Sequence, residues 1–136
     1  MYTKFALALE DAKRVAAAAA REAQANGWNV VIAVVDDGGA LVYLEKLDGV
    51  QPASCEIAQH KARTAAAFRR PTKALEDIVA GGRVAMLSLP NITPVEGGVP
   101  LVYRGDVVGA IGVSGVQSFQ DGMVAKAGAD VLLADQ

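Results

Sequence analysis

Cysteine, histidine and aromatic residues are scarce in this chain of 136 residues. Cys55 is the single cysteine, which excludes an intramolecular disulfide and favours the reducing cytoplasm. His60 is the single histidine, so the chain has no histidine and cysteine spacing of the kind that forms a zinc site. Because aromatic residues make up only 5% of the chain, its core must be built from Ala, Val, Leu and Ile.

The chain also has no strong excess of positive or negative charge and no long apolar run. The net charge is −2, with acidic and basic residues mixed along the chain, so we expect neither nucleic acid nor an anionic membrane as a partner. No apolar run reaches the roughly 18 residues that span a bilayer. The length suits one domain over residues 1–136, with a small molecule as the expected ligand.

The hydrophobic pattern predicts four helices and two antiparallel hairpins. Helices are expected over residues 3–26, 52–68, 72–79 and 119–134, and hairpins over 30–35 with 40–47 and over 99–104 with 107–113. Residues 86–89 are expected to form a short strand or an extended segment. Because hairpins and helices are segregated along the chain, we predict an α+β fold rather than a parallel wound sheet.

Three glycines interrupt the otherwise apolar strand expected at 107–113 and the turn after it. They are Gly109, Gly112 and Gly115. A glycine inside a strand usually marks a bulge or the close approach of another backbone or a ligand. The sequence therefore predicts a close approach on this strand and leaves open whether a backbone or a ligand makes it.

The helix expected at 52–68 places Lys61 in the middle of its apolar stripe. A lysine there is costly unless its ammonium is paired or reaches water. One interpretation is that the aliphatic stem packs and the ammonium extends to solvent. The other is that Lys61 meets an anionic ligand or a carboxylate, with Glu96 and Asp121 as the candidates.

The best candidate site is the glycine-rich loop at 93–100. Successive amides at Gly97 and Gly98 can converge on an anion, and Glu96 can act as a base or a ligand. Ser114 ends a strand shortly before a helix and can offer hydrogen bonds to a carboxylate or phosphate. Asp121, at the start of the last helix, is interpreted as a capping residue that also faces the ligand.

His60 shares one face of its helix with Glu56 and Arg63. A lone histidine in that setting is more often a surface or interface residue than a metal ligand. The metal-ligand interpretation is kept as the less frequent case.

Several motifs together resemble those of the GlcG/HbpS family of small haem-binding or haem-degrading domains, whose relatives also form the C-terminal part of some corrinoid adenosyltransferases. The resemblance spans nearly the whole chain. The motifs are Val34-Val35-Asp36-Asp37-Gly38-Gly39, Glu56-Ile57-Ala58 with Lys61-Ala62-Arg63-Thr64-Ala65, Glu96-Gly97-Gly98-Val99-Pro100-Leu101, and Val108-Gly109-Ala110-Ile111-Gly112-Val113-Ser114-Gly115.

The resemblance implies a five-stranded antiparallel sheet with helices packed on it, in a profilin-like layout, and assembly into homo-oligomers. It also implies a cytoplasmic domain that binds haem or another anionic small molecule. The pocket is expected between helix 52–68 and loop 93–100. The available iron ligands are His60, Tyr103 and Met86.

In this hypothesis Lys61 pairs with a carboxylate of the ligand, the amides of Gly97 and Gly98 orient it, and Ser114 and Asp121 complete the site. The alternative hypothesis is an isomerase, hydratase or lyase of small organic acid or aromatic catabolism. There Glu96 is the acid/base and Lys61 clamps the anion.

Overall fold

The computed structural model describes all residues from 1 to 136. The elements follow one another as α1 (Leu9–Ala25), β1 (Val31–Asp36), β2 (Leu41–Lys46), α2 (Ser54–Phe68), α3 (Thr72–Ala80), the short 3-10 helix η1 (Val84–Ser88), β3 (Gly98–Tyr103), β4 (Asp106–Ser114) and α4 (Ser118–Ala134). None of the helices is both long and apolar enough to cross a membrane.

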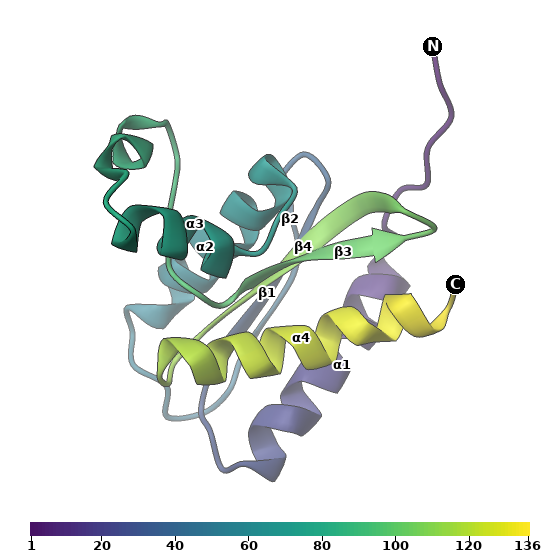
Figure 1. The fold of residues 1–136 in the computed structure, drawn as a ribbon. Helices are drawn as coiled ribbons and strands as arrows, with labels where there is room; N and C mark the ends of the chain where they lie inside the picture. The colour runs from purple at the N-terminus through teal and green to yellow at the C-terminus, as the bar shows by residue number, and fades with distance from the viewer.

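One antiparallel sheet divides the molecule into three layers (Figure 1). Its strands follow the order β2-β1-β4-β3, so that β2 and β3 form the edges. Helices α1 and α4 pack against each other on one face, and α2 packs on the other face against β4 and β1. The α+β fold predicted from the sequence is therefore confirmed.

Strand β1 supplies side chains to both layers, which explains why its sequence is apolar without alternation. Ile32 and Val34 belong to the larger core under α1 and α4. Val31 and Val35 belong to the smaller core under α2. Successive strand residues point to opposite faces, so a strand covered on both sides must be apolar at every position.

The close approach predicted for the glycine strand is made by a backbone, not by a ligand. A Cβ on Gly112 would lie 2.5 Å from the amide nitrogen of Ala62 and closer still to the carbonyl oxygen of Ala58, both in α2. Gly98 pairs with Gly112 in the sheet and faces the carbonyl of Lys61 in the same way. Helix α2 therefore lies with its backbone directly on a row of glycines.

The sheet has four strands, and the expected fifth strand is wrong. Residues 86–89, the candidate for an additional extended segment, lie largely in η1 and pair with no strand. Met86 is buried there, while Val84 and Leu87 are exposed. Of these three side chains, only that of Met86 packs η1 against the rest of the protein.

The first helix begins at Leu9 rather than near Thr3. The side chain of Asp11 accepts a hydrogen bond from the Ala8 N–H at 3.0 Å, which caps the helix at that point. The preceding residues form an extended arm, visible at the N-terminus in Figure 1. Phe5 of this arm packs edge-on against Tyr103, with ring centroids 4.9 Å apart, and so takes no part in the helix.

Replacing Gly112 tests the close contact between the backbone of α2 and the sheet. We expect Gly112→Ala to lower the free energy of unfolding by more than about 3 kcal/mol, because the new methyl group collides with helix backbone that cannot rotate away. Urea denaturation followed by circular dichroism measures the effect. The control is Gly38→Ala, whose methyl group would make only an ordinary 3.5 Å contact with Asp36. Equal stability of the two variants would contradict the proposed contact between Gly112 and the backbone of α2.

Candidate functional site

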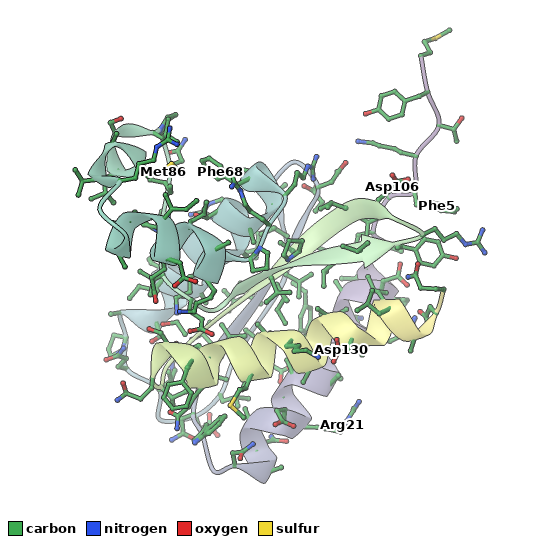
Figure 2. The ribbon with its side chains drawn as sticks, in the orientation of Figure 1. Phe5, Arg21, Phe68, Met86, Asp106 and Asp130 are labelled. Carbon is green, nitrogen blue, oxygen red and sulfur yellow. The ribbon has the colours of Figure 1, made fainter.

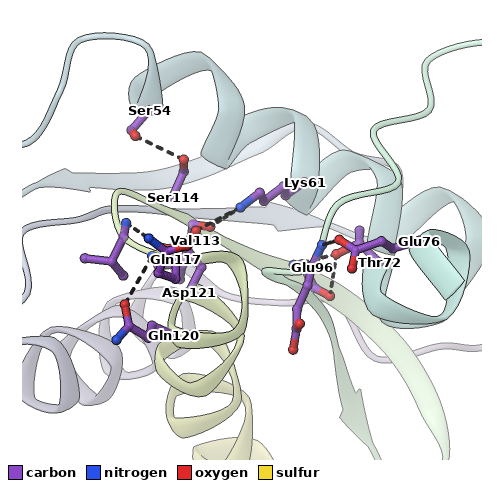
Figure 3. A network of polar contacts seen from close by, with 12 residues as sticks. Ser54, Lys61, Thr72, Glu76, Glu96, Val113, Ser114, Gln117, Gln120 and Asp121 are labelled. Atoms are coloured by element: carbon purple, nitrogen blue, oxygen red, sulfur yellow. Dashed lines mark hydrogen bonds and ion pairs between the residues drawn. The ribbon is translucent and has the colours of Figure 1, made fainter. Parts of the chain in front are cut away.

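Lys61 is almost fully buried and forms an internal ion pair, so the interpretation in which its ammonium reaches solvent is wrong. Its Nζ lies 3.1 Å from Oδ2 of Asp121 and donates to the carbonyl of Val113 at 3.1 Å (Figure 3). The side chain passes beneath Gly97, where a Cβ would stand 2.8 Å from Nζ. Lys61 thus joins α2 to the end of β4 and the first turn of α4.

Asp121 is held on both oxygens. Oδ2 accepts from Lys61, and Oδ1 accepts from the Val116 N–H at 3.1 Å, ahead of α4. Burial raises the pKa of Asp121 above its ordinary value, because a carboxylate loses hydration there, while the Lys61 ammonium and the Val116 amide act in the opposite direction. Lys61 is therefore the largest of the influences that favour the charged form of this carboxylate.

Two further predicted ligand contacts are already used inside the protein. The hydroxyl of Ser114 donates to Oγ of Ser54 at 3.0 Å in a buried pair. The N–H of Gly98 donates to Oγ1 of Thr72 at 2.8 Å. Neither group is free to orient a ligand in this arrangement.

Glu96, Gly97 and Gly98 line a hollow of about 340 Å³. Its second wall is α4, through Gly122, Lys126 and Leu133, and no residue of α2 borders it. The predicted loop therefore does border a hollow, but with α4 in the place expected for α2. The reason is that the backbone of α2 fills the space on its own side of the glycine row.

His60 lines a different hollow, on the exposed side of α2. This hollow of about 570 Å³ is bordered by the turn between β1 and β2, by α2 and its C-terminal end, and by one residue of the loop after η1. It brings His60, Arg63, Arg69 and Asn91 together with Asp37, Gly38 and Gly39. The Asp37 carboxylate is paired with Lys4 of the N-terminal arm at 2.6 Å. This hollow is the place where the only histidine meets two cationic side chains.

The imidazole of His60 is only weakly held. Its Nδ1 lies 3.4 Å from the guanidinium of Arg63, and its Nε2 lies 3.8 Å from the carboxylate of Glu56. The first distance is at the long end for a hydrogen bond, the second is beyond it, and the histidine and glutamate side chains are about half exposed or more. Either ring nitrogen can therefore turn to an incoming metal at small cost.

The other two predicted iron ligands lie elsewhere in the molecule. Tyr103 packs against Phe5, beside the turn that joins β3 and β4, and Met86 is buried in the excursion that carries η1 (Figure 2). Neither borders the hollow of His60.

The structure thus separates the predicted site residues into three places. Lys61, Ser114 and Asp121 are internal, Glu96 with its glycines borders one hollow, and His60 borders another. Sequence reasoning did not single out Arg69, which follows the helix predicted at 52–68. Arg69 follows the last residue of α2, takes the left-handed conformation (φ 55°) and reaches the second hollow. An arginine rarely adopts this conformation, so the residue type alone does not predict the turn.

Comparison with known proteins identifies the family. The family described as "Haem degrading protein HbpS-like" matches residues 7–130, and the chain belongs to it. Among its relatives is the protein GlcG of Escherichia coli strain K12, which is 49% identical over 114 residues, covering 84% of this chain and 85% of GlcG.

Solved structures agree with this assignment. A double mutant of HbpS from Streptomyces reticuli superposes with a TM-score of 0.89 at 34% identity, covering 97% of this chain and 90% of that one. A structure described as a PduOC:heme complex superposes with a TM-score of 0.83 at 28% identity, covering 93% of this chain and 94% of that one. The resemblance predicted from the sequence motifs is confirmed.

Removing the ammonium of Lys61 tests the internal pair. We expect Lys61→Met to lose about 3–5 kcal/mol of stability at neutral pH, because the Asp121 carboxylate remains buried without its partner. Burial without the lysine raises the pKa of Asp121 further, so the folded variant takes up a proton more readily than the unfolded chain. Its stability should therefore rise as the pH falls towards 5, which urea denaturation at several pH values measures.

The double variant Lys61→Met/Asp121→Asn is the matched control. It removes both charges and keeps an oxygen that can accept from the Val116 amide. We expect it to recover much of the lost stability and to lose the pH dependence. A single variant as stable as the original protein at pH 7 would contradict the role given to the pair.

Proposed function

We propose that this protein binds haem in the hollow lined by His60, Arg63 and Arg69. The observation that carries the proposal is that the single histidine, half exposed and weakly held, shares a hollow of about 570 Å³ with two arginines. Membership of the HbpS-like family and the similarity to a PduOC:heme complex support the same ligand.

The donor set of this hollow fits haem. His60 offers one imidazole nitrogen, which suits iron in a ring that supplies the equatorial nitrogens itself. Arg63 and Arg69 offer guanidinium groups, which match the geometry of carboxylates such as the haem propionates. The glycines of the β1–β2 turn and the alanines of α2 add only small groups to the wall, and its one carboxylate, Asp37, is paired with Lys4.

When bound, haem supplies an iron centre for ligand or electron chemistry. The residues of this chain bind and orient it. His60 would hold the metal through a ring nitrogen that now faces Arg63 or Glu56, and Arg63 would donate to a carboxylate of the ring. Nothing beyond binding and orientation is assigned to these side chains.

The alternative hypothesis of an enzyme loses support from the geometry. It required Glu96 as acid/base and Lys61 as the clamp for an anion in one site. Lys61 does not border the hollow of Glu96, because its ammonium lies behind Gly97 and is occupied by Asp121 and Val113.

We also propose that the protein is a cytoplasmic homo-oligomer, as its family resemblance implies. Exposed apolar side chains near the start of α4 support an interface between copies; they are Phe119 and Met123.

Haemin titration of the purified protein tests the iron ligand. We expect a saturable, shifted Soret band that His60→Ala abolishes, because the variant loses the nitrogen proposed to bind iron. Tyr103→Phe and Met86→Leu serve as matched controls and should keep the band, since neither residue borders this hollow. A band that persists in His60→Ala would refute the assignment, and no saturable band in the original protein would refute haem binding.

The propionate contacts are tested separately. Arg63→Ala and Arg69→Ala should each weaken haemin binding about tenfold, the effect of losing one charge-assisted hydrogen bond at a partly exposed site. The band position should stay unchanged because His60 is retained. Arg21→Ala removes an exposed arginine of α1 outside the hollow and should bind haemin like the original protein (Figure 2). Equal binding by all three variants would contradict the propionate contacts.

A further inference from the structure

The hollow beside Glu96 is a second candidate site, separate from that of His60. It lies between the edge strand β3 and the last helix, and no residue borders both hollows. Its volume of about 340 Å³ suits a small molecule. The walls are largely apolar; the apolar side chains are Pro71, Val99, Pro100, Val102, Ala129 and Leu133.

Glu96 is the polar group of this hollow without a partner. Its backbone N–H donates to Oε1 of Glu76 at 3.0 Å, but its own carboxylate takes part in no hydrogen bond or ion pair of the protein (Figure 3). The carboxylate lies against Gly122 of α4, where a Cβ would stand 2.8 Å from Oε2. The absence of a side chain at Gly122 thus makes room for it.

The two lysines at the rim are already paired. Nζ of Lys73 lies 2.8 Å from Asp77 and 3.9 Å from Glu76, and Nζ of Lys126 lies 2.9 Å from Asp130. Of the four charged side chains that line the hollow, only Glu96 has no ion-pair partner. A cationic group is favoured over an anionic one beside Glu96, because its unpaired carboxylate lies next to an apolar wall.

We infer that this hollow binds a small apolar molecule that carries a primary ammonium group. The ammonium donates to the carboxylate of Glu96, and the apolar body packs against Val99, Val102 and Leu133. A hydrogen bond between charged groups is the strong kind, and an apolar wall excludes the water that would compete with it.

Three probes with one body and different head groups test this inference on the protein without haem. They are cyclohexylmethylamine, cyclohexanecarboxylate and cyclohexylmethanol, titrated at pH 7 and followed by amide chemical shifts in nitrogen-15 NMR spectra. We expect the amine to bind saturably and to shift the amides of Gly97, Gly98 and Gly122, which line the hollow. The carboxylate should bind at least about tenfold more weakly.

Glu96→Gln keeps the shape of the side chain and removes its charge, so it should weaken amine binding at least about tenfold. Glu10→Gln makes the same charge change on α1, away from the hollow, and should bind the amine like the original protein. The inference is overturned if the amine does not bind, if the carboxylate binds as tightly, or if Glu96→Gln binds the amine unchanged. None of these outcomes depends on haem, so failure here leaves the assignment of His60 standing.

Discussion

The contact between the backbone of α2 and the glycines of the sheet determines the positions of α2, of the buried Lys61 side chain and of the surface hollows. Gly98 and Gly112 are neighbours on β3 and β4, and α2 lies on them so closely that a methyl group at either position would collide with its backbone. Close packing of this kind leaves a helix little room to shift on the sheet. The backbone of α2 fills the space above these glycines, so the hollows lined by Glu96 and by His60 lie outside this contact.

The same contact explains why a lysine is buried in the middle of an apolar helix. Because α2 lies so low on the sheet, the stem of Lys61 passes beneath Gly97 and its ammonium meets Asp121 and the Val113 carbonyl. Burying two charges costs hydration that their attraction repays only with good geometry. The pair joins α2, β4 and α4 at one point, so it specifies how the layers on opposite faces are aligned.

The two hollows differ in their chemistry. The one beside α2 combines an imidazole with guanidinium groups, which suits a metal with carboxylate substituents. The one beside α4 combines an unpaired carboxylate with an apolar wall, which suits a cation. They share no lining residue, so binding at one hollow can be tested independently of binding at the other.

The sequence by itself determined the α+β class, the four helices, the two hairpins and the family, because periodicity and motif spacing are local properties of the chain. It also predicted that the glycine strand is approached closely and named Asp121 among the partners of Lys61. Only the tertiary structure decided that a helix makes the approach, and that Lys61 pairs with Asp121 and does not border the hollow lined by Glu96. Those outcomes depend on how the layers pack and where α2 ends at Arg69, and contacts between residues distant in sequence leave no periodic signal.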